Sequence, residues 1–191
     1  MNTAELTLTF DDVIDVSTLA PQFITLQNTA GGSDPVNTYT LMRGSSNSSD
    51  GYSMIIDIEV NDLNEIKMRD GLATDTVNTF ISLRAATIKE VAGSNVAPVL
   101  DDDALQVSQF RPDITRPFLE QFSIDLTREV LVLAFSEAVN VTSLDLTQIT
   151  LQSHQNSENA TEIYTLTGGL PTPTITGVTI TISLTKFDLD L

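Results

Sequence analysis

Residues 8–28 read LTFDDVIDVSTLAPQFITLQN and residues 133–153 read LAFSEAVNVTSLDLTQITLQS, so the chain contains two versions of one stretch. Sliding the chain by 125 residues aligns residues 6–44 with residues 131–169 without a gap. The identical positions include the run ITLQ, the run YTL and the glycine at the end of each aligned segment. A period of this length indicates tandem domains of Ig-like size rather than the short units of a solenoid.

Alternation of apolar and polar residues predicts that both copies are built from strands. Leu6, Leu8 and Phe10 alternate with Thr7 and Thr9, which is the period of a strand with one buried face. Polar, turn-forming stretches such as NTAGGSDP, RGSSNSSDG and SHQNSENA separate the apolar segments. Many short strands at close spacing predict an all-β fold made of tandem Ig-like β-sandwiches.

One short helix is expected in each repeat. Asp62 is a candidate N-cap, with Glu65 three residues later completing a capping box. Gly71 is placed to end this helix in a left-handed conformation. The second copy reaches Leu191 near the point where its own helix should begin. The segments STLAP and TSLDL are expected to form briefer helical turns.

The repeat divides the chain into two expected domains, residues 1–112 and residues 113–191. The first is expected to lack its opening strand, because only the second copy is preceded by an apolar alternating segment, PFLEQFSID. The second is expected to be truncated in its C-terminal part. Open sheet edges would follow in both, so we expect either a much longer array or missing strands supplied by neighbouring molecules.

Charge and composition narrow the classes of function. The net charge of −17 arises from 26 acidic and 9 basic residues, and such a field repels nucleic acid and anionic membrane surfaces. The absence of Cys excludes disulfides, thiolate metal sites and a Cys nucleophile. No apolar stretch is long enough for membrane insertion, and the start MNTAELTLTF does not resemble a signal peptide. We therefore expect either an intracellular protein or a piece of a longer exported one.

The segments LTLTFDDVIDVSTL and LVLAFSEAVNVTSLDLTQITL resemble bacterial-type Ig-like repeats of the S-layer type, which occur in tandem in very large cell-surface proteins. IKEVAGSNVAP resembles their closing strand, although Glu90 replaces an Asp and a Ser is inserted before Asn95. RPDITRPFLEQFSIDL resembles the linker and first strand of arrays in algal and other protist surface proteins, including flagellar hairs. The resemblance implies extracellular or cell-surface scaffolding or adhesion and carries over no catalytic residues.

The acidic residues suggest one cofactor, Ca²⁺. Asp101, Asp102, Asp103 and Asp113 lie between the two copies, where their carboxylates would stiffen the joint by sharing a calcium ion. No EF-hand spacing is present, and alternate residues of an extended chain point apart, so a solvated acidic linker is the competing interpretation. A second cluster, Asp11, Asp12 and Asp15, has only Glu137 and Asn140 as partial equivalents in the second copy.

Three Asn-x-Ser/Thr triplets are candidate glycosylation sites: Asn47, Asn140 and Asn159. Asn47 and Asn159 lie in polar loops, where sugars would shield the turns. Such triplets also arise readily by chance in a chain rich in Asn, Ser and Thr. Their use depends on an exported eukaryotic origin.

No catalytic residue is expected. His154 is the single His, in a polar loop, and its neighbourhood in the sequence offers no nucleophile. The glycine pairs lack the helix and Lys of a phosphate-binding loop. Tyr39 and Tyr164 recur one period apart; carbohydrate stacking is one interpretation, and a core or corner tyrosine is the more usual one.

These observations predict a non-catalytic structural segment of a large extracellular fibre, hair or cell-surface protein. Its partners would be neighbouring copies of itself or other fibre subunits. The alternative is an adhesin or carbohydrate-binding module that recognises a surface ligand, such as a glycan, through its loops. The chain has no Trp and is 6% aromatic, which counts against this alternative. An accessory domain of an enzyme would require a catalytic neighbour elsewhere.

Overall fold

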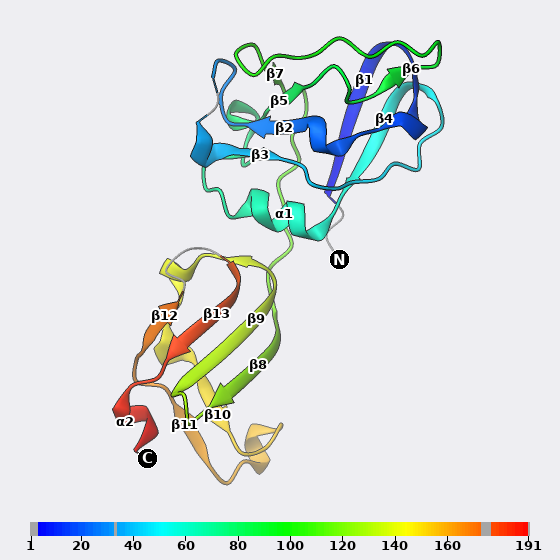
Figure 1. The fold of residues 1–191 in the computed structure, drawn as a ribbon. Helices are drawn as coiled ribbons and strands as arrows, with labels where there is room; N and C mark the ends of the chain where they lie inside the picture. Colours follow the sequence, from blue (N-terminus) through cyan, green and yellow to red (C-terminus); the bar gives the residue numbers. More distant parts are fainter. Residues whose placement is uncertain (1–3, 33, 173–176, 191) are drawn as a thin grey trace. The chain divides into compact units, whose positions relative to one another are not determined.

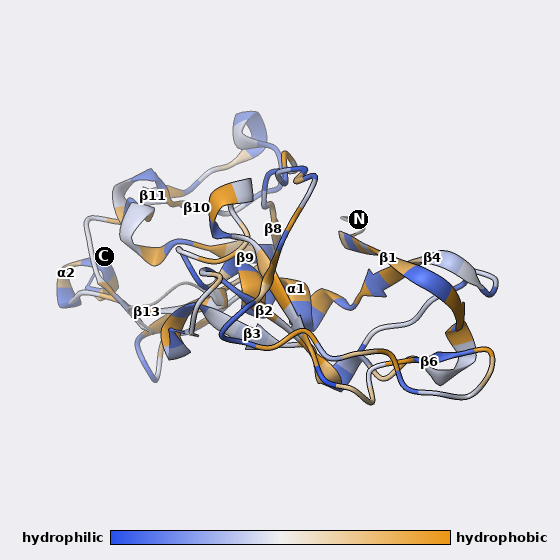
Figure 2. Ribbon diagram, turned by 90° about the horizontal axis from the view of Figure 1, so that it is seen from above, coloured by the Kyte–Doolittle hydropathy of each residue, from blue (hydrophilic) through white to orange (hydrophobic). Residues whose placement is uncertain are grey.

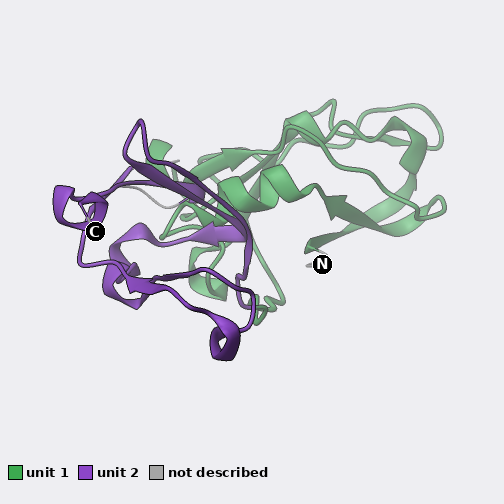
Figure 3. Cartoon of the chain, turned by 90° about the horizontal axis from the view of Figure 1, so that it is seen from below, with its two compact units in different colours: residues 1–115 green, residues 116–191 purple. Residues whose placement is uncertain are grey.

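The chain forms two compact units, residues 1–115 and residues 116–191 (Figure 3). The computed structural model describes residues 4–32, 34–172 and 177–190. The division lies close to the boundary after residue 112 expected from the repeat. We call residues 1–115 unit 1 and residues 116–191 unit 2.

Unit 1 contains two antiparallel sheets (Figure 1). The first has the order β4-β1-β6, with β1 at Ala4–Asp15, β4 at Gly51–Ile58 and β6 at Lys89–Glu90. The second has the order β3-β2-β5-β7, with β2 at Ile24–Gln27, β3 at Thr38–Thr40, β5 at Phe80–Leu83 and β7 at Leu105–Gln106. The helix α1, Val60–Lys67, follows β4.

One hydrophobic core joins the two sheets of unit 1. Met54 and Ile56 of β4 belong to the same buried cluster as Ile24 and Leu26 of β2. Their position follows from the strand period, because alternate side chains point to opposite faces. Hydrophobic and hydrophilic bands also alternate along β1 in Figure 2. Each fully buried aliphatic side chain contributes about 1.5–3 kcal/mol, so the packed sheet faces hold this sandwich together.

Unit 2 is also built from antiparallel sheets. The larger has the order β12-β13-β9-β8, with β8 at Leu119–Asp125, β9 at Val130–Val139, β12 at Leu170–Thr172 and β13 at Gly177–Ser183. The smaller pairs β10, Thr150–Gln152, with β11, Ile163–Thr165. The short helix α2 spans Lys186–Leu189 and follows β13. The all-β, sandwich-like fold expected from the strand period is confirmed, and the two α-helices are short.

The two units share strand register. In unit 1 Leu6 of β1 is opposite Ile56 of β4; in unit 2 Leu131 of β9 is opposite Ile182 of β13. Both pairs of strands then shift register before their last pair, in which Ile14 meets Gly51 and Val139 meets Gly177. The repeated sequence therefore folds into the same pair of strands twice.

A second pair of strands repeats in the same way. Thr25 of β2 is opposite Thr40 of β3, with their hydroxyl oxygens 2.8 Å apart. Thr150 of β10 is opposite Thr165 of β11, with a corresponding distance of 2.9 Å. Cross-strand threonine pairs of this kind stabilise a sheet and fix its register.

The glycine shared by the two copies packs against equivalent backbone. A Cβ on Gly44 would lie 3.3 Å from the carbonyl oxygen of Asp57 in β4. A Cβ on Gly169 would lie 2.8 Å from the carbonyl oxygen of Ser183 in β13, and Gly169 has a φ of +145°. Close approach of backbone to backbone explains why both positions hold glycine.

The structure corrects the expected start and end of the helix. The N-cap of α1 is Glu59, which makes no capping hydrogen bond, and Asp62 lies inside the first turn with 2% of its surface exposed. The helix ends at Lys67, and Gly71 does not adopt the left-handed conformation. The capping prediction is wrong because tertiary partners, described below, use the carboxylate of Asp62. The briefer turns expected near residues 17–21 and 142–146 form as 3₁₀ turns.

The units differ in the strands that flank the shared pairs. In unit 2 β8 lies beside β9, whereas β1, the equivalent of β9, pairs over residues 4–9 with β4 alone among the described strands. In unit 1 β5 lies beside β2, whereas β10, the equivalent of β2, pairs with β11 alone in the described part of unit 2. Each unit therefore leaves open an edge that is covered in the other.

Candidate functional site

A buried tyrosine–aspartate pair closes one corner of unit 1. Asp62 of α1 accepts a hydrogen bond from the Tyr39 hydroxyl at 2.7 Å, through Oδ1. Its Oδ2 accepts the backbone N–H groups of Met42 and Arg43, both at 2.9 Å. The carboxylate thus ties the helix to β3 and to the chain that leaves β3. We call this arrangement the unit 1 corner.

Burial and charge keep the Tyr39 hydroxyl protonated. Burial raises the pKa of Tyr39 well above its usual range, and the hydrogen bond to the Asp62 carboxylate raises it further. The Arg69 guanidinium carbon lies 4.8 Å from the centre of the Tyr39 ring, in cation–π geometry. The hydroxyl is therefore a permanent donor, and its role is to hold the helix in place.

The same corner recurs in unit 2. Asp188 of α2 accepts hydrogen bonds from the Tyr164 hydroxyl at 2.8 Å and from the backbone N–H of Thr167 at 2.8 Å. The hydroxyls of Thr167 and Thr185 donate to the same carboxylate, each at 2.7 Å. Tyr39 and Tyr164 are 125 residues apart, whereas Asp62 and Asp188 are 126 apart. We call this arrangement the unit 2 corner.

Hydrogen bonding dominates the acidity of Asp188. Burial acts to raise its pKa, but donors from Thr185, Thr167 and Tyr164 outweigh burial and hold the pKa well below the usual range of an Asp. The carboxylate consequently stays ionised through the physiological range. An always-ionised acceptor with structural donors is suited to holding backbone rather than to proton transfer.

The tyrosines are therefore corner residues, as favoured from the sequence. Tyr39 is 9% exposed and its hydroxyl is occupied by Asp62, so it offers no ring face of the kind that stacks on a sugar. The aspartates were missed as partners of the tyrosines. Aligning residues 51–63 with residues 177–189, after a one-residue insertion, places Asp62 opposite Asp188 and would have found them.

The predicted calcium ligands do not form one described cluster. Asp113 lies 2.5 Å from Nζ of Lys67, an ion pair within unit 1. The backbone carbonyl of Asp101 accepts a hydrogen bond from Nε2 of Gln27 at 2.7 Å. This bond anchors the loop containing Asp102 and Asp103 to β2. In the described part of the chain, no three Asp, Glu, His or Cys side chains come together as a group that would hold a metal ion. Calcium binding remains a prediction.

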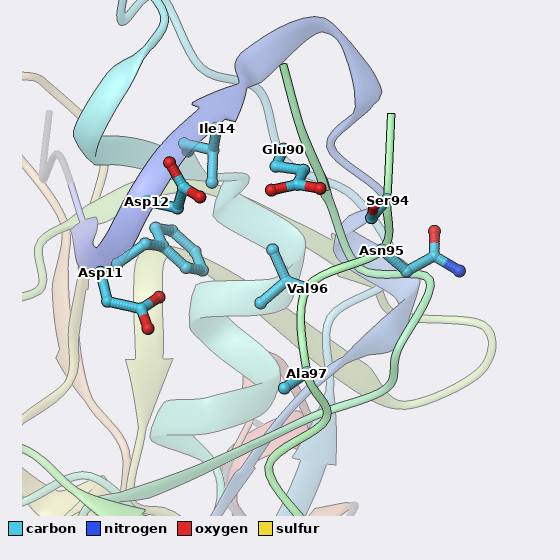
Figure 4. A pocket seen from close by; sticks show the side chains of 9 residues that line it. Asp11, Asp12, Ile14, Glu90, Ser94, Asn95, Val96 and Ala97 are labelled. Atoms are coloured by element: carbon cyan, nitrogen blue, oxygen red, sulfur yellow. The ribbon is translucent and has the colours of Figure 1, made fainter. Parts of the chain in front are cut away.

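An acidic hollow lies beside the end of β1. It has a volume of about 270 Å³ and is lined on one side by Phe10, Asp11 and Asp12 of β1, and on the other by the segment from Glu90 to Ala97 (Figure 4). Asp15, the third member of the second acidic cluster, has a different role, because its Oδ1 accepts the N–H of Ser17 at 3.0 Å and caps a 3₁₀ turn. The acidic side chains are thus divided between a turn and a hollow.

The three candidate glycosylation sites are exposed. Asn47 lies in the loop before β4, and Asn159 lies in a 3₁₀ turn between β10 and β11. Asn140 caps the 3₁₀ turn after β9, where its Oδ1 accepts the N–H of Thr142 at 2.9 Å and its hydroxyl at 2.7 Å. A sugar on Asn140 would have to coexist with this cap, whereas Asn47 carries no such constraint among its described contacts.

His154 lies in the exposed loop after β10. Its Nδ1 accepts a hydrogen bond from the backbone N–H of Asn156 at 3.2 Å, which is a contact within the turn.

Among the described residues no helix has the length and apolarity needed to cross a membrane.

No protein-family model, no curated protein and no solved structure matches this chain. The resemblance to S-layer-type Ig-like repeats therefore remains an expectation drawn from the sequence motifs.

Proposed function

We propose that this chain is a non-catalytic structural segment of a large extracellular fibre, hair or cell-surface protein, made of Ig-like repeats. The observation that carries the proposal is the recurrence of one plan in two units. The same strand register, the same threonine pair and the same tyrosine–aspartate corner appear twice.

Repetition of this kind has a mechanical use. Each unit buries its own core, so a pulling force on an array is resisted by every unit in turn. Pro112 and Pro117 flank the division between the units and favour an extended backbone there. The net charge of −17 repels neighbouring surfaces and keeps such an array soluble.

Imaging of the native particle tests the proposal. Filaments with density that repeats at the spacing of one unit would support it. Isolated globules that bind a glycan array saturably would refute it and favour an adhesin or carbohydrate-binding module. Intact-mass measurement on the same native material would show whether Asn47, Asn140 and Asn159 carry sugars.

A further inference from the structure

The open edge of β1 is a strand-sized acceptor site. In unit 2, β9 carries β4's counterpart, β13, on one side and β8 on the other. In unit 1, β1 carries β4 on the corresponding side, and β6 pairs on the other side only with Ile14 and Asp15. Among the described residues, nothing pairs with that side of β1 from Glu5 to Phe10. Unpaired backbone of this length is a template for another strand.

Burial differs between the two units as a missing strand requires. Leu131 and Leu133 of β9, which lie opposite Ile124 and Phe122 of β8, are 0% and 5% exposed. Their equivalents in β1, Leu6 and Leu8, are only partly buried. The difference arises although the buried cluster of unit 2 is the smaller of the two. A strand beside β1 would cover apolar surface that is now in contact with water.

The chemistry of the occupant follows from the pairing of β8 with β9. The strand runs antiparallel, with Phe122 opposite Leu133 and Ile124 opposite Leu131. Phe122 and Ile124 are themselves 55% and 41% exposed, so they flank the core residues rather than joining the buried cluster. At its start, the N–H of Phe118 donates to the hydroxyl of Ser136 at 3.1 Å, and the Phe118 carbonyl accepts the N–H of Ser136 at 3.0 Å. The equivalent of Ser136 in unit 1 is Asp11, whose carboxylate is a stronger acceptor for the same N–H.

Charge also favours a strand of the β8 kind. Phe10 ends the open stretch and lines the acidic hollow together with Asp11, Asp12 and Glu90 (Figure 4). Leu119 of β8 lies opposite Phe135, the equivalent of Phe10. In a strand of the same sequence bound to β1, Arg116 would therefore lie beyond Phe10 toward the C-terminal end of β1, where the hollow is. A cation there would be attracted by the carboxylates.

We propose that the edge of β1 from Glu5 to Phe10 binds a β8-type strand supplied by a neighbouring repeat: extended, antiparallel, apolar at alternate positions and basic at its N-terminal end. The inference rests on the proposed function only for the source of the strand, a neighbouring repeat in the assembly. Addition of a strand would then join units through backbone hydrogen bonds, while the alternating side chains and the acidic hollow fix the register.

The test uses the full chain and a synthetic peptide with the sequence of residues 116–127, RPFLEQFSIDLT. Amide exchange of the isotope-labelled protein is followed by NMR as the peptide is added. We expect the outward-pointing amides between Glu5 and Phe10 to exchange at least about 10-fold more slowly, since new backbone bonds protect them. A control peptide with proline at positions 121 and 123 should give no protection, because proline disrupts strand pairing.

A matched pair of variants tests the role of the hollow. Asp11→Asn combined with Asp12→Asn should weaken peptide binding roughly threefold to tenfold at low salt, as expected for exposed ion pairs. Asp101→Asn combined with Asp102→Asn removes the same charge elsewhere in unit 1 and should leave binding unchanged.

Three results would overturn the proposal. The first is no protection at millimolar peptide. The second is protection that appears at β10 instead of β1. The third is protection of the β1 edge that depends on protein concentration alone and leaves the β8 amides unchanged, which would assign the edge to pairing between the β1 strands of two copies of this chain. None of these three results bears on whether the native particle is a filament. Conversely, globular native particles would contradict the proposed function but not a positive peptide titration.

Discussion

The unit 1 corner makes a quantitative prediction about stability. Tyr39→Phe removes the hydroxyl that donates to Asp62 at 2.7 Å and keeps the ring beside Arg69. A hydrogen bond to a charged group contributes about 1.5–3 kcal/mol, and Asp62 retains its two backbone donors, so we expect a loss of about 1.5–2 kcal/mol. For a unit of this size that corresponds to a melting temperature lower by roughly 6–8 °C.

Asp62→Ala should cost more, because it leaves three donors without their acceptor: the Tyr39 hydroxyl and the amides of Met42 and Arg43. We expect a loss of about 3–5 kcal/mol. The double variant has no Tyr39 hydroxyl to be left without an acceptor. Its loss of unfolding free energy should therefore be smaller than the sum of the losses in the two single variants. The expected coupling is about 1.5–2 kcal/mol.

Urea unfolding of the full chain, followed by NMR signals from β2 and β4, measures these free energies for unit 1. Tyr164→Phe provides the matched control, because it removes the equivalent hydroxyl from unit 2. Asp188 keeps the threonine hydroxyl donors, and the variant should leave the unfolding of unit 1 unchanged. If the loss in the double variant equals the sum of the two single losses to within about 0.5 kcal/mol, the reasoning is refuted. The Tyr39–Asp62 hydrogen bond would then contribute no coupling energy.

Four further outcomes are expected. Because hydrogen bonding depresses the pKa of Asp188, its contribution is present above the unfolded value of about 3.9 and fades as pH falls below it; Asp188→Asn should reduce the acid sensitivity of unit 2 in pH-dependent unfolding. Gly169→Ala should cost about 2–4 kcal/mol from left-handed strain and crowding, and Gly44→Ala about 1 kcal/mol, in thermal melts. Calcium at millimolar concentration should raise the melting temperature if the 101–103 run and Asp113 bind it, and an unchanged melt would discard that site. Unit 2 has the smaller buried cluster, so hydrogen exchange should show β9 and β13 opening before β1 and β4, and the reverse order would contradict this.

Strands of the shared core were predictable because their side chains alternate. The runs around Leu6, Leu131 and Ile180 have the period of two throughout, and burial of one face leaves no competing arrangement. Strands of two or three residues, such as β6 and β12, carry too few positions to show a period. They form where a passing loop meets a longer strand, which is a property of the tertiary fold.

The role of Asp62 was not predictable from its immediate neighbours. Asp62 and Glu65 satisfy the local rule for a capping box, and that rule places the helix start three residues late. The observed start follows from Tyr39 and the chain after β3, which bind the carboxylate from 19 to 23 residues away. Comparison of the two copies would have revealed this, because an aspartate that recurs after a one-residue insertion has a tertiary rather than a local cause.

The acidic hollow could not be read from the sequence either. Asp11 and Asp12 are visible as a pair of carboxylates, but the opposite wall is supplied by the segment from Glu90 to Ala97, nearly 80 residues away. That segment reaches β1 through the N–H of Val91, which donates to the carbonyl of Val13 at 3.0 Å. Because the hollow forms only where two distant segments meet, neither segment has a sequence pattern that predicts it.

The positions at which the two copies agree explain what the repeat requires. Agreement falls on the core strands, on Gly44 and Gly169, and on the tyrosine–aspartate corners, all of which turn the chain or hold its two sheets together. The outer edge of β1 and the loops are not so constrained, and there the copies differ in charge, as at Asp11 and Ser136. A repeat that fixes its corners and varies its edges can keep one fold while changing what each edge binds. Specificity of assembly would then be determined by edge strands and the charges beside them, which is where the peptide titration looks for it.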